Sequence, residues 1–132
     1  MGQFLIELLE PAGYTPPQAC LDAFNIQFGD AVRTEWSEKN DSYEAISYKG
    51  GLEHIACYNE KGFLKNYKMF LPKELLPLSI TSQLSSRGEI MNSVLFNNGH
   101  SIQYEVIIRE PDSVRQLILF STTGEILKQE RL

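Results

Sequence analysis

The sequence contains few of the residues that build metal sites and disulfide frameworks. Its 132 residues include two cysteines, Cys20 and Cys57, and two histidines, His54 and His100. Neither histidine has a cysteine, a second histidine or a carboxylate at metal-ligand spacing, so the sequence predicts no metal site and no cofactor. Two cysteines are too few for a disulfide framework, and both lie in apolar stretches where cysteine acts as a small hydrophobic residue. The sequence leaves open whether they form a single bridge.

Two further absences concern positive charge and long apolar runs. The 17 acidic residues outnumber the 12 basic ones, and the resulting net charge of -5 disfavours binding to nucleic acids and anionic membrane surfaces. No apolar run approaches the roughly 18 residues of a membrane-spanning helix. The initial stretch MGQFLIELL includes Glu7 and lacks the basic flank of a signal peptide. We therefore expect a soluble chain with no membrane span and no nucleic-acid partner.

What the sequence does contain is an internal repeat with an offset of about 60 residues, and such a repeat constrains topology more firmly than local propensity does. The repeat predicts a single domain, with an N-terminal extension at 1–15 and repeat units at 16–71 and 72–132. The matched positions keep their order along the chain and pair Pro17 with Pro77, Cys20 with Ile80, Phe24 with Leu84, Gly29 with Gly88, Tyr43 with Tyr104, Cys57 with Leu119 and Gly62 with Gly124.

Each unit begins with an amphipathic stretch of helical spacing and continues with segments that alternate apolar and polar residues. In the first unit we expect Thr15 to cap a helix that holds Pro16 and Pro17 in its first turn and stops at a left-handed Gly29. The second helix is expected at 77–87, and a short extra helix at 2–9. The expected strands are 32–37, 43–48, 52–58, 63–71, 90–96, 102–109, 114–120 and 125–131.

The connections between the expected strands decide the topology. They are too short to hold a crossover helix, so neighbouring strands must be antiparallel. Two helices cannot cover both faces of about eight strands. The sequence therefore predicts an α+β fold in which two tandem helix-plus-four-strand units form one antiparallel meander sheet with the helices packed on one face. The other face would stay open to water and available to a partner.

Several stretches of this arrangement together carry a resemblance to a known family. They are the helix from Pro17 to Phe28, the strand VRTEW from Val32, the segment Tyr43-Glu44-Ala45, the hairpin ACYNEKG from Ala56, and Leu76-Pro77 at the start of the second half. In order and spacing these stretches resemble the PepSY-like family, which is related in fold to the beta-lactamase inhibitor protein. The resemblance implies tandem helix-plus-sheet units without enzymatic activity, in the periplasm or cell envelope. Family members usually carry an export signal, which this chain does not show, so a cytoplasmic location is the alternative.

The residue pairs that could suggest catalysis have structural explanations. His54 and Cys57 stand three apart on an expected strand, so their side chains point to opposite faces. Glu44 and Glu105 occupy matching repeat positions, which favours a scaffold feature such as a cross-strand ion pair over acid-base chemistry. The serines and threonines of the expected turns lack the surroundings of a nucleophile elbow. We therefore expect that the protein is not an enzyme.

The candidate binding residues lie on two of the expected strands. Glu44, Ile46 and Tyr48 share one face of the strand at 43–48. Tyr67 and Met69 stand at positions that the second unit fills with polar residues, which favours their exposure. Exposed aromatic residues on a sheet are effective interface anchors, because they bury a large area at a low cost in rotamer entropy.

These observations predict a non-enzymatic binding module that presents an open antiparallel sheet face to a protein partner. The resemblance suggests that its role is inhibitory or sensory. The alternative is a carrier of a small molecule or peptide, with a pocket between the helices and the sheet. The identity of the partner, the compartment and the oligomeric state do not follow from the sequence.

Overall fold

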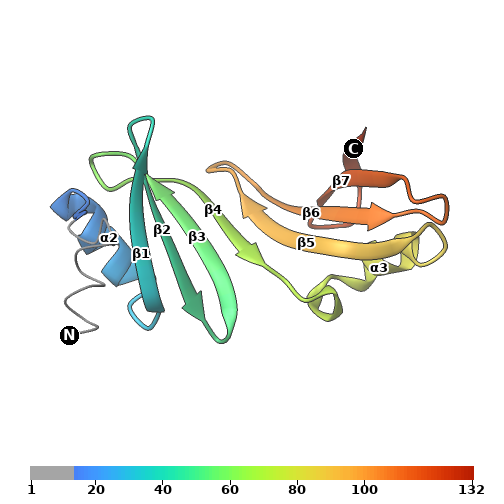
Figure 1. Ribbon diagram of the computed structural model, residues 1–132, viewed down its shortest axis with the longest axis horizontal. Helices are drawn as coiled ribbons and strands as arrows, with labels where there is room; N and C mark the ends of the chain where they lie inside the picture. Colours follow the sequence, from blue (N-terminus) through green and yellow to red (C-terminus); the bar gives the residue numbers. More distant parts are fainter. Residues whose placement is uncertain (1–13) are drawn as a thin grey trace, which may run out of the picture.

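The computed structural model describes residues 14–132, which form one sheet and two α-helices (Figure 1). The short helix expected at 2–9 lies outside the described residues. The elements follow the chain as α2 (Gln18–Gln27), β1 (Val32–Lys39), β2 (Ser42–Lys49), β3 (Leu52–Tyr58), β4 (Leu64–Phe70), the 3-10 helix η1 (Lys73–Leu75), α3 (Leu78–Leu84), β5 (Glu89–Asn97), β6 (Ile102–Arg109), β7 (Arg115–Ser121) and β8 (Ile126–Arg131).

The sheet is an eight-stranded meander in which each strand pairs with its neighbours in the chain, in the order β1 to β8. Every pairing is antiparallel. The tight β2–β3 hairpin turns at Gly50 and Gly51, which both have the positive φ angles that favour glycine. The predicted antiparallel meander is therefore confirmed.

Both helices begin directly after a proline. Pro17 is the N-cap of α2 and Pro77 is the N-cap of α3, and neither helix start has a side-chain cap hydrogen bond. A proline suits this place because the first N–H groups of a helix have no partner within it. The expectations that Thr15 caps α2 and that both prolines lie in its first turn were wrong. Gly29 is not left-handed either; a Cβ there would lie 2.7 Å from the carbonyl oxygen of Asn25.

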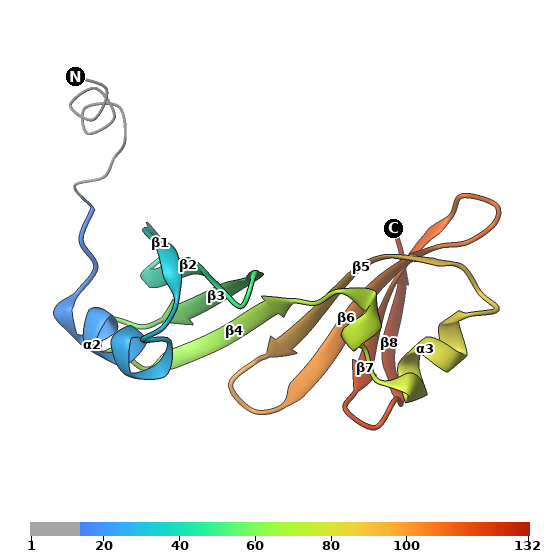
Figure 2. The same ribbon diagram turned by 90° about the horizontal axis from the view of Figure 1, so that it is seen from below.

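Each helix packs on its own half of the sheet and forms a separate core. Figure 2 shows both helices on the same side of the sheet. Burying one large apolar side chain contributes roughly 1.5–3 kcal/mol, so each core is a substantial source of stability. The core under α2 consists of Cys20, Phe24, Ala45, Ala56 and Tyr58. The core under α3 consists of Leu76, Ile80, Leu84, Val106, Ile108, Ile118 and Phe120.

The two halves share the same irregularities of strand pairing. The first strand pair of each half has a register shift, between Val32 and Glu35 in β1 and between Ile90 and Asn92 in β5. The last strand pair of each half has another, at Cys57 of β3 and at Leu119 of β7. Bulges interrupt regular pairing at particular positions, so their recurrence at matched places is what an internal repeat predicts.

The last hairpin of each half closes against the first turn of its helix. Gly62 and Gly124 have φ angles of 83° and 93°, and their N–H groups donate to the carbonyl oxygens of Asn59 and Ser121 at 3.0 and 3.1 Å. A Cβ on Gly62 would lie 2.5 Å from the carbonyl oxygen of Ala19, and one on Gly124 would lie 2.9 Å from the side chain of Ser79. Glycine is therefore required at each position for two reasons, the positive φ angle and the close approach of the hairpin to the helix.

The halves meet where β4 pairs with β5. Four residue pairs join the two strands, from Tyr67 opposite Asn97 to Phe70 opposite Val94. In Figure 1, β1 to β3 are close to vertical while β5 and β6 run across the view, so the sheet twists strongly at this junction. The division into units 16–71 and 72–132 stays a prediction; its boundary falls between β4 and η1.

Candidate binding face

The sheet face opposite the helices is named here the open face. Side chains alternate along a strand, so the residues next to buried core positions point away from the helices. In β2, Ala45 lies under α2, and its neighbours Glu44 and Ile46 lie on the open face. In β6, Val106 lies under α3, and its neighbour Ile107 lies on the open face.

The centre of the open face in each half is an apolar cross-strand pair. Ile46 of β2 stands opposite Ile55 of β3, and Ile107 of β6 stands opposite Leu117 of β7. All four side chains are partly exposed. Side chains directly opposite each other on one face of an antiparallel pair are in contact range. The face therefore carries the same apolar feature twice, once over each core.

Further apolar residues connect these two pairs across the junction. Phe70 of β4 stands opposite Val94 of β5, and Lys68 stands opposite Phe96. The Lys68 ammonium lies 5.4 Å from the centre of the Phe96 ring, within the range of a cation–π interaction. Apolar side chains therefore continue from the first half of the open face to the second.

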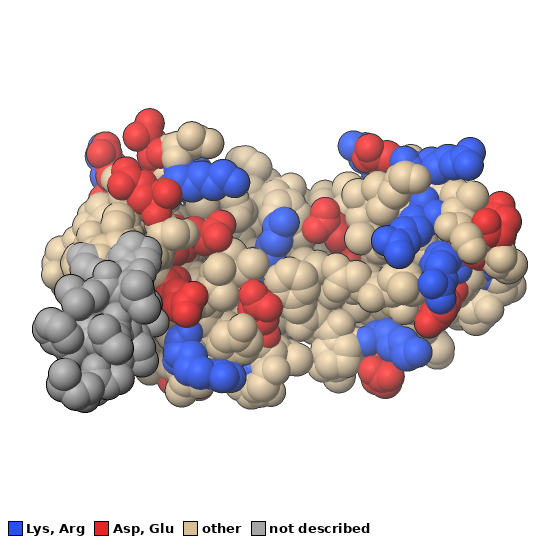
Figure 3. Space-filling view, viewed as in Figure 1, with Lys and Arg blue, Asp and Glu red and all other residues tan. Residues whose placement is uncertain are grey.

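Charged side chains stand among these apolar residues and at their edge. At the β1 side, the guanidinium of Arg33 lies 4.5 Å from the centre of the Tyr48 ring. Glu44 and Glu105 lie on the open face at matched positions. Figure 3 looks onto this face; where described atoms are visible, uncharged atoms cover most of its middle, and charged side chains gather at the upper left and at the right. Protein-binding surfaces likewise combine apolar side chains with a smaller number of polar and charged ones.

The expected cross-strand ion pair at Glu44 or Glu105 is absent from the described part of the chain. The ion pairs within residues 14–132 are Lys49–Asp30, Arg109–Glu89 and Lys128–Glu130, at 3.3, 2.8 and 3.7 Å. None of them includes Glu44 or Glu105, so the expectation of an ion pair was wrong, and a scaffold role for the two glutamates stays a prediction.

The structure brings together three of the five predicted binding residues and separates the other two. Glu44, Ile46 and Tyr48 share the open face, as expected. Tyr67 stands opposite Ala56 and Met69 stands opposite His54, which places both on the helix side of the sheet. The prediction that Tyr67 and Met69 join the other three on one binding face was wrong.

Tyr67 is part of the first core rather than an exposed anchor. Its ring stacks on Phe28 with centroids 5.3 Å apart, and its hydroxyl is hydrogen-bonded to Nδ1 of His54. In the second half, Arg87 takes the place of Phe28 and donates a hydrogen bond of 3.3 Å to Gln129, the counterpart of Tyr67. The contact between the helix end and the last strand is therefore aromatic in the first half and polar in the second.

His54 is a buried residue whose environment the sequence analysis did not identify. Only 6% of it is exposed. Its Nε2 lies 3.4 Å from the carbonyl oxygen of Lys49. Ser47 stands opposite it in β2, with a buried hydroxyl that has no hydrogen-bond partner. The alternation of His54 with the buried Ala56 is the sequence signal that could have revealed its burial.

The buried cysteine and tyrosine of the first core are held in their neutral forms. Burial raises the pKa of the Cys20 thiol, which donates a hydrogen bond of 3.2 Å to the carbonyl oxygen of Asn59. Burial also raises the pKa of the Tyr58 hydroxyl, which donates to Gln27 at 2.8 Å. A raised pKa disfavours the thiolate that a catalytic cysteine needs. Both Cys20 and Cys57 are free thiols.

The remaining chemistry of the described residues is sparse. No group of three His, Cys, Asp or Glu side chains within 14–132 could hold a metal ion. No helix in this part of the chain is long and apolar enough to cross a membrane.

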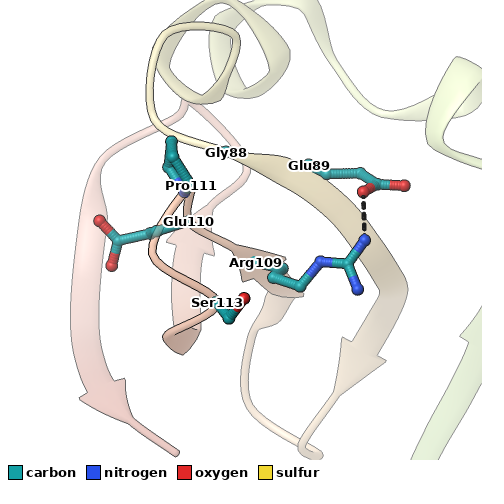
Figure 4. A pocket seen from close by; sticks show the side chains of 6 residues that line it. All are labelled: Gly88, Glu89, Arg109, Glu110, Pro111 and Ser113. Carbon is teal, nitrogen blue, oxygen red and sulfur yellow. Dashed lines mark hydrogen bonds and ion pairs between the residues drawn. The ribbon is translucent and has the colours of Figure 1, made fainter.

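A pocket at the far end of the second half lies beside the β6–β7 turn. Figure 4 shows Glu89 and Arg109 joined by an ion pair of 2.8 Å, next to Pro111 and Ser113 of the turn. Both charged side chains of this pair are about half exposed, which makes the ion pair a weak, solvated one. A second hollow, where η1, α3 and the start of β5 meet, includes Leu84 and Ile90 in its lining and is open to solvent. Neither hollow encloses a ligand as a small-molecule carrier site does.

Comparisons with known proteins identify the fold. No protein-family model and no curated protein matches the chain. A BLIP-like protein from Bacteroides fragilis NCTC 9343 is 20% identical with a TM-score of 0.79, over 91% of this chain and 89% of that one. A DUF2874 family protein from Bacteroides ovatus ATCC 8483 is 16% identical with a TM-score of 0.79, over 90% and 89%.

A third solved structure adds a description of location. This protein from Bacteroides eggerthii DSM 20697, provisionally described as periplasmic, is 16% identical with a TM-score of 0.78, over 89% of this chain and 90% of that one. These likenesses show that the chain has a BLIP-like fold, that is, one like the beta-lactamase inhibitor protein. The resemblance to the PepSY-like family stays a prediction.

Proposed function

We propose that this protein is a non-enzymatic binding module whose open face docks a protein partner. The observation that carries the proposal is the repeated apolar pair, Ile46 with Ile55 and Ile107 with Leu117, on the face that the helices leave uncovered. Apolar side chains partly exposed on a rigid sheet release water on binding without losing much conformational entropy. The two pairs would anchor one partner at two places.

The extent of the face favours a protein partner over a small ligand. The apolar residues run from β2 to β7 through the junction at Phe70 and Val94. Small-molecule sites are concave and enclose most of their ligand, whereas protein interfaces are broad with a charged rim. Glu44 and Glu105 beside the two apolar pairs would select a partner with basic residues at matching places.

Several features support a role without catalysis. The one buried histidine is enclosed by Tyr67, Phe28 and a backbone carbonyl, on the side of the sheet away from the open face. The BLIP-like fold supports an inhibitory or sensory role, and the provisional periplasmic description of one neighbour supports a place in the cell envelope. In this proposal the chain consists of two tandem helix-plus-four-strand units, and each contributes one apolar anchor.

The test removes both anchors at once. We expect that Ile46→Lys combined with Ile107→Lys reduces recovery of the partner at least tenfold in affinity capture from cells of the source organism, since buried anchor residues each contribute about 1–2 kcal/mol or more. Quantitative mass spectrometry compares the proteins captured by this variant and by the wild type.

The matched control is Ile26→Lys, because Ile26 lies on α2 and is 85% exposed. This substitution introduces the same side chain on the helix side of the molecule. Thermal melting confirms that each variant is folded. Equal recovery by the wild type, the control and the double variant would show that the open face is not the docking surface.

A further inference from the structure

The two outer edges of the sheet are built differently. Within residues 14–132, no strand pairs with the outer side of β1 or β8. β1 is interrupted by the register shift between Val32 and Glu35, with Arg33 at a φ of 53°. Such a bulge prevents another strand from pairing along the edge. β8 pairs regularly with β7 from Lys128 onward, and all of its residues are exposed.

β4 is the counterpart of β8 in the first half, and its outer side pairs with another strand. Asn66 of β4 and Lys128 of β8 occupy matching positions, because they stand opposite Cys57 and Leu119 in their halves. In β4 the residues that follow, 67–70, pair with β5. The matching residues in β8 are 129–132, which have no strand beside them in the described chain.

The apolar residues of this edge are unusually exposed. Ile126, Leu127 and Leu132 are 46%, 50% and 59% exposed, and they stand at the two ends of β8. Lys128 and Glu130 lie between them, with side chains 63% and 53% exposed.

We propose that β8 pairs with β8 of a second copy of this chain, antiparallel about a twofold axis through Gln129. In this register Lys128 of each copy stands opposite Glu130 of the other, which gives two cross-strand charge pairs. Ile126 lies beyond the register shift of β8, so the matched stretch of each copy is 128–130. The sheets of the two copies then join into one, and both open faces lie on the same side. This proposal is independent of the function proposed for the open face.

The backbone of β8 is oriented for this pairing. The N–H of Leu132 donates to the carbonyl oxygen of Arg115 in β7 at 2.9 Å. Backbone groups alternate in direction along a strand, so those of Lys128 and Glu130 also point toward β7, and those of Gln129 and Arg131 point outward. Gln129 of each copy can therefore exchange both N–H···O bonds with Gln129 of the other.

Neighbouring registers lack this complementarity. An axis through Lys128 would place two lysines opposite each other, and an axis through Glu130 would place two glutamates opposite each other. An axis between two residues would set outward-pointing backbone groups against inward-pointing ones. Charged residues on an edge strand often prevent pairing, but the order of the charges in β8 fits a second copy in one register.

Sedimentation velocity of the purified protein over a range of concentrations tests the proposal. The wild type is expected to form a dimer. Glu130→Lys places lysines opposite each other and is expected to raise the dimer dissociation constant about tenfold or more. Exchanging the charges, with Lys128→Glu added to Glu130→Lys, is expected to restore the dimer. Glu38→Lys makes the same change of charge on the other edge strand and is expected to change nothing.

Amide hydrogen exchange locates the interface. The outward N–H groups of Gln129 and Arg131 are expected to exchange more slowly as the protein concentration rises, and this protection should disappear in Glu130→Lys. A wild type that stays monomeric up to about 0.5 mM would overturn the proposal, because such an association would be too weak to matter. A dimer that Glu130→Lys leaves intact would also overturn it. The assay uses no other protein, so its failure would leave the open-face proposal unaffected.

Discussion

Alanine substitution of the paired hairpin glycines should destabilise the two halves by different amounts. Gly62→Ala and Gly124→Ala each place a Cβ on a residue with positive φ and direct it at the first turn of a helix. Gly50 provides the reference: its φ is 60°, but a Cβ there would meet nothing within 4 Å. Gly50→Ala therefore measures the cost of the conformation alone, expected to be about 1–2 kcal/mol.

The structure predicts an order among the three variants. The new Cβ at position 62 would lie 2.5 Å from the carbonyl oxygen of Ala19, a backbone atom that moves only if the hairpin leaves α2. The new Cβ at position 124 would lie 2.9 Å from Cβ and Oγ of Ser79, and 3.2 Å from its carbonyl oxygen. Overpacking of this kind adds about 1–3 kcal/mol, so we expect a total near 2–5 kcal/mol for Gly62→Ala and a smaller one for Gly124→Ala.

Urea unfolding followed by circular dichroism measures these free energies, and a second substitution separates the contacts. Ser79→Gly removes the side chain that the new Cβ at 124 would meet, so the pair should show a favourable coupling energy. Ala19→Gly leaves the obstructing carbonyl of residue 19 in place and should not rescue Gly62→Ala. A Gly62→Ala protein no less stable than Gly50→Ala would refute the proposed close contact between hairpin and helix.

Two further predictions concern the first core. Phe28→Ala should lower the free energy of unfolding by about 2–3 kcal/mol, because it removes the ring that packs against Tyr67 and Phe24. Arg87→Ala at the matching position should lower it by less than about 1 kcal/mol. Urea unfolding distinguishes the two. Raising the pH above about 10 should lower the free energy of unfolding. Tyr58 keeps its proton in the folded protein at a pH at which the tyrosine of the unfolded chain has lost it, because burial raises its pKa. The decrease in stability between pH 8 and pH 11 should therefore be smaller in Tyr58→Phe.

Much of the fold could be predicted because its signals are periodic. The alternation of apolar and polar residues predicted the strands, and the short connections between them required an antiparallel meander. The start of α2 was misplaced by two residues, because Thr15 and two adjacent prolines all favour the same turn. The helix begins after Pro17 without using the Thr15 side chain as a cap.

The candidate site could be predicted only in part. Glu44, Ile46 and Tyr48 follow from the alternation within one strand, and the structure keeps them together. The sheet face of Tyr67 and Met69 depends on how β4 pairs with β3. The register shift at Cys57 changes which residues of β4 stand on each face. A shift of one residue moves every side chain of a strand to the other face, so that register could not be inferred from composition.

Contacts between distant elements also lay beyond the sequence. The exchange of Phe28 and Tyr67 for Arg87 and Gln129 involves a helix end and a strand far apart in the chain. Each residue by itself indicated only that one repeat unit was more polar than the other. The comparison of the two halves became informative when the structure showed that both pairs occupy the same place.

Site-specific photo-crosslinking in cells of the source organism tests most directly whether the open face binds a protein. A photoreactive phenylalanine analogue is placed at Ile46, at Ile107 or, as the control, at the exposed Ile26 of α2. The account predicts that positions 46 and 107 capture the same protein and that position 26 does not. Capture of a protein at position 26 with none at 46 or 107 would contradict it.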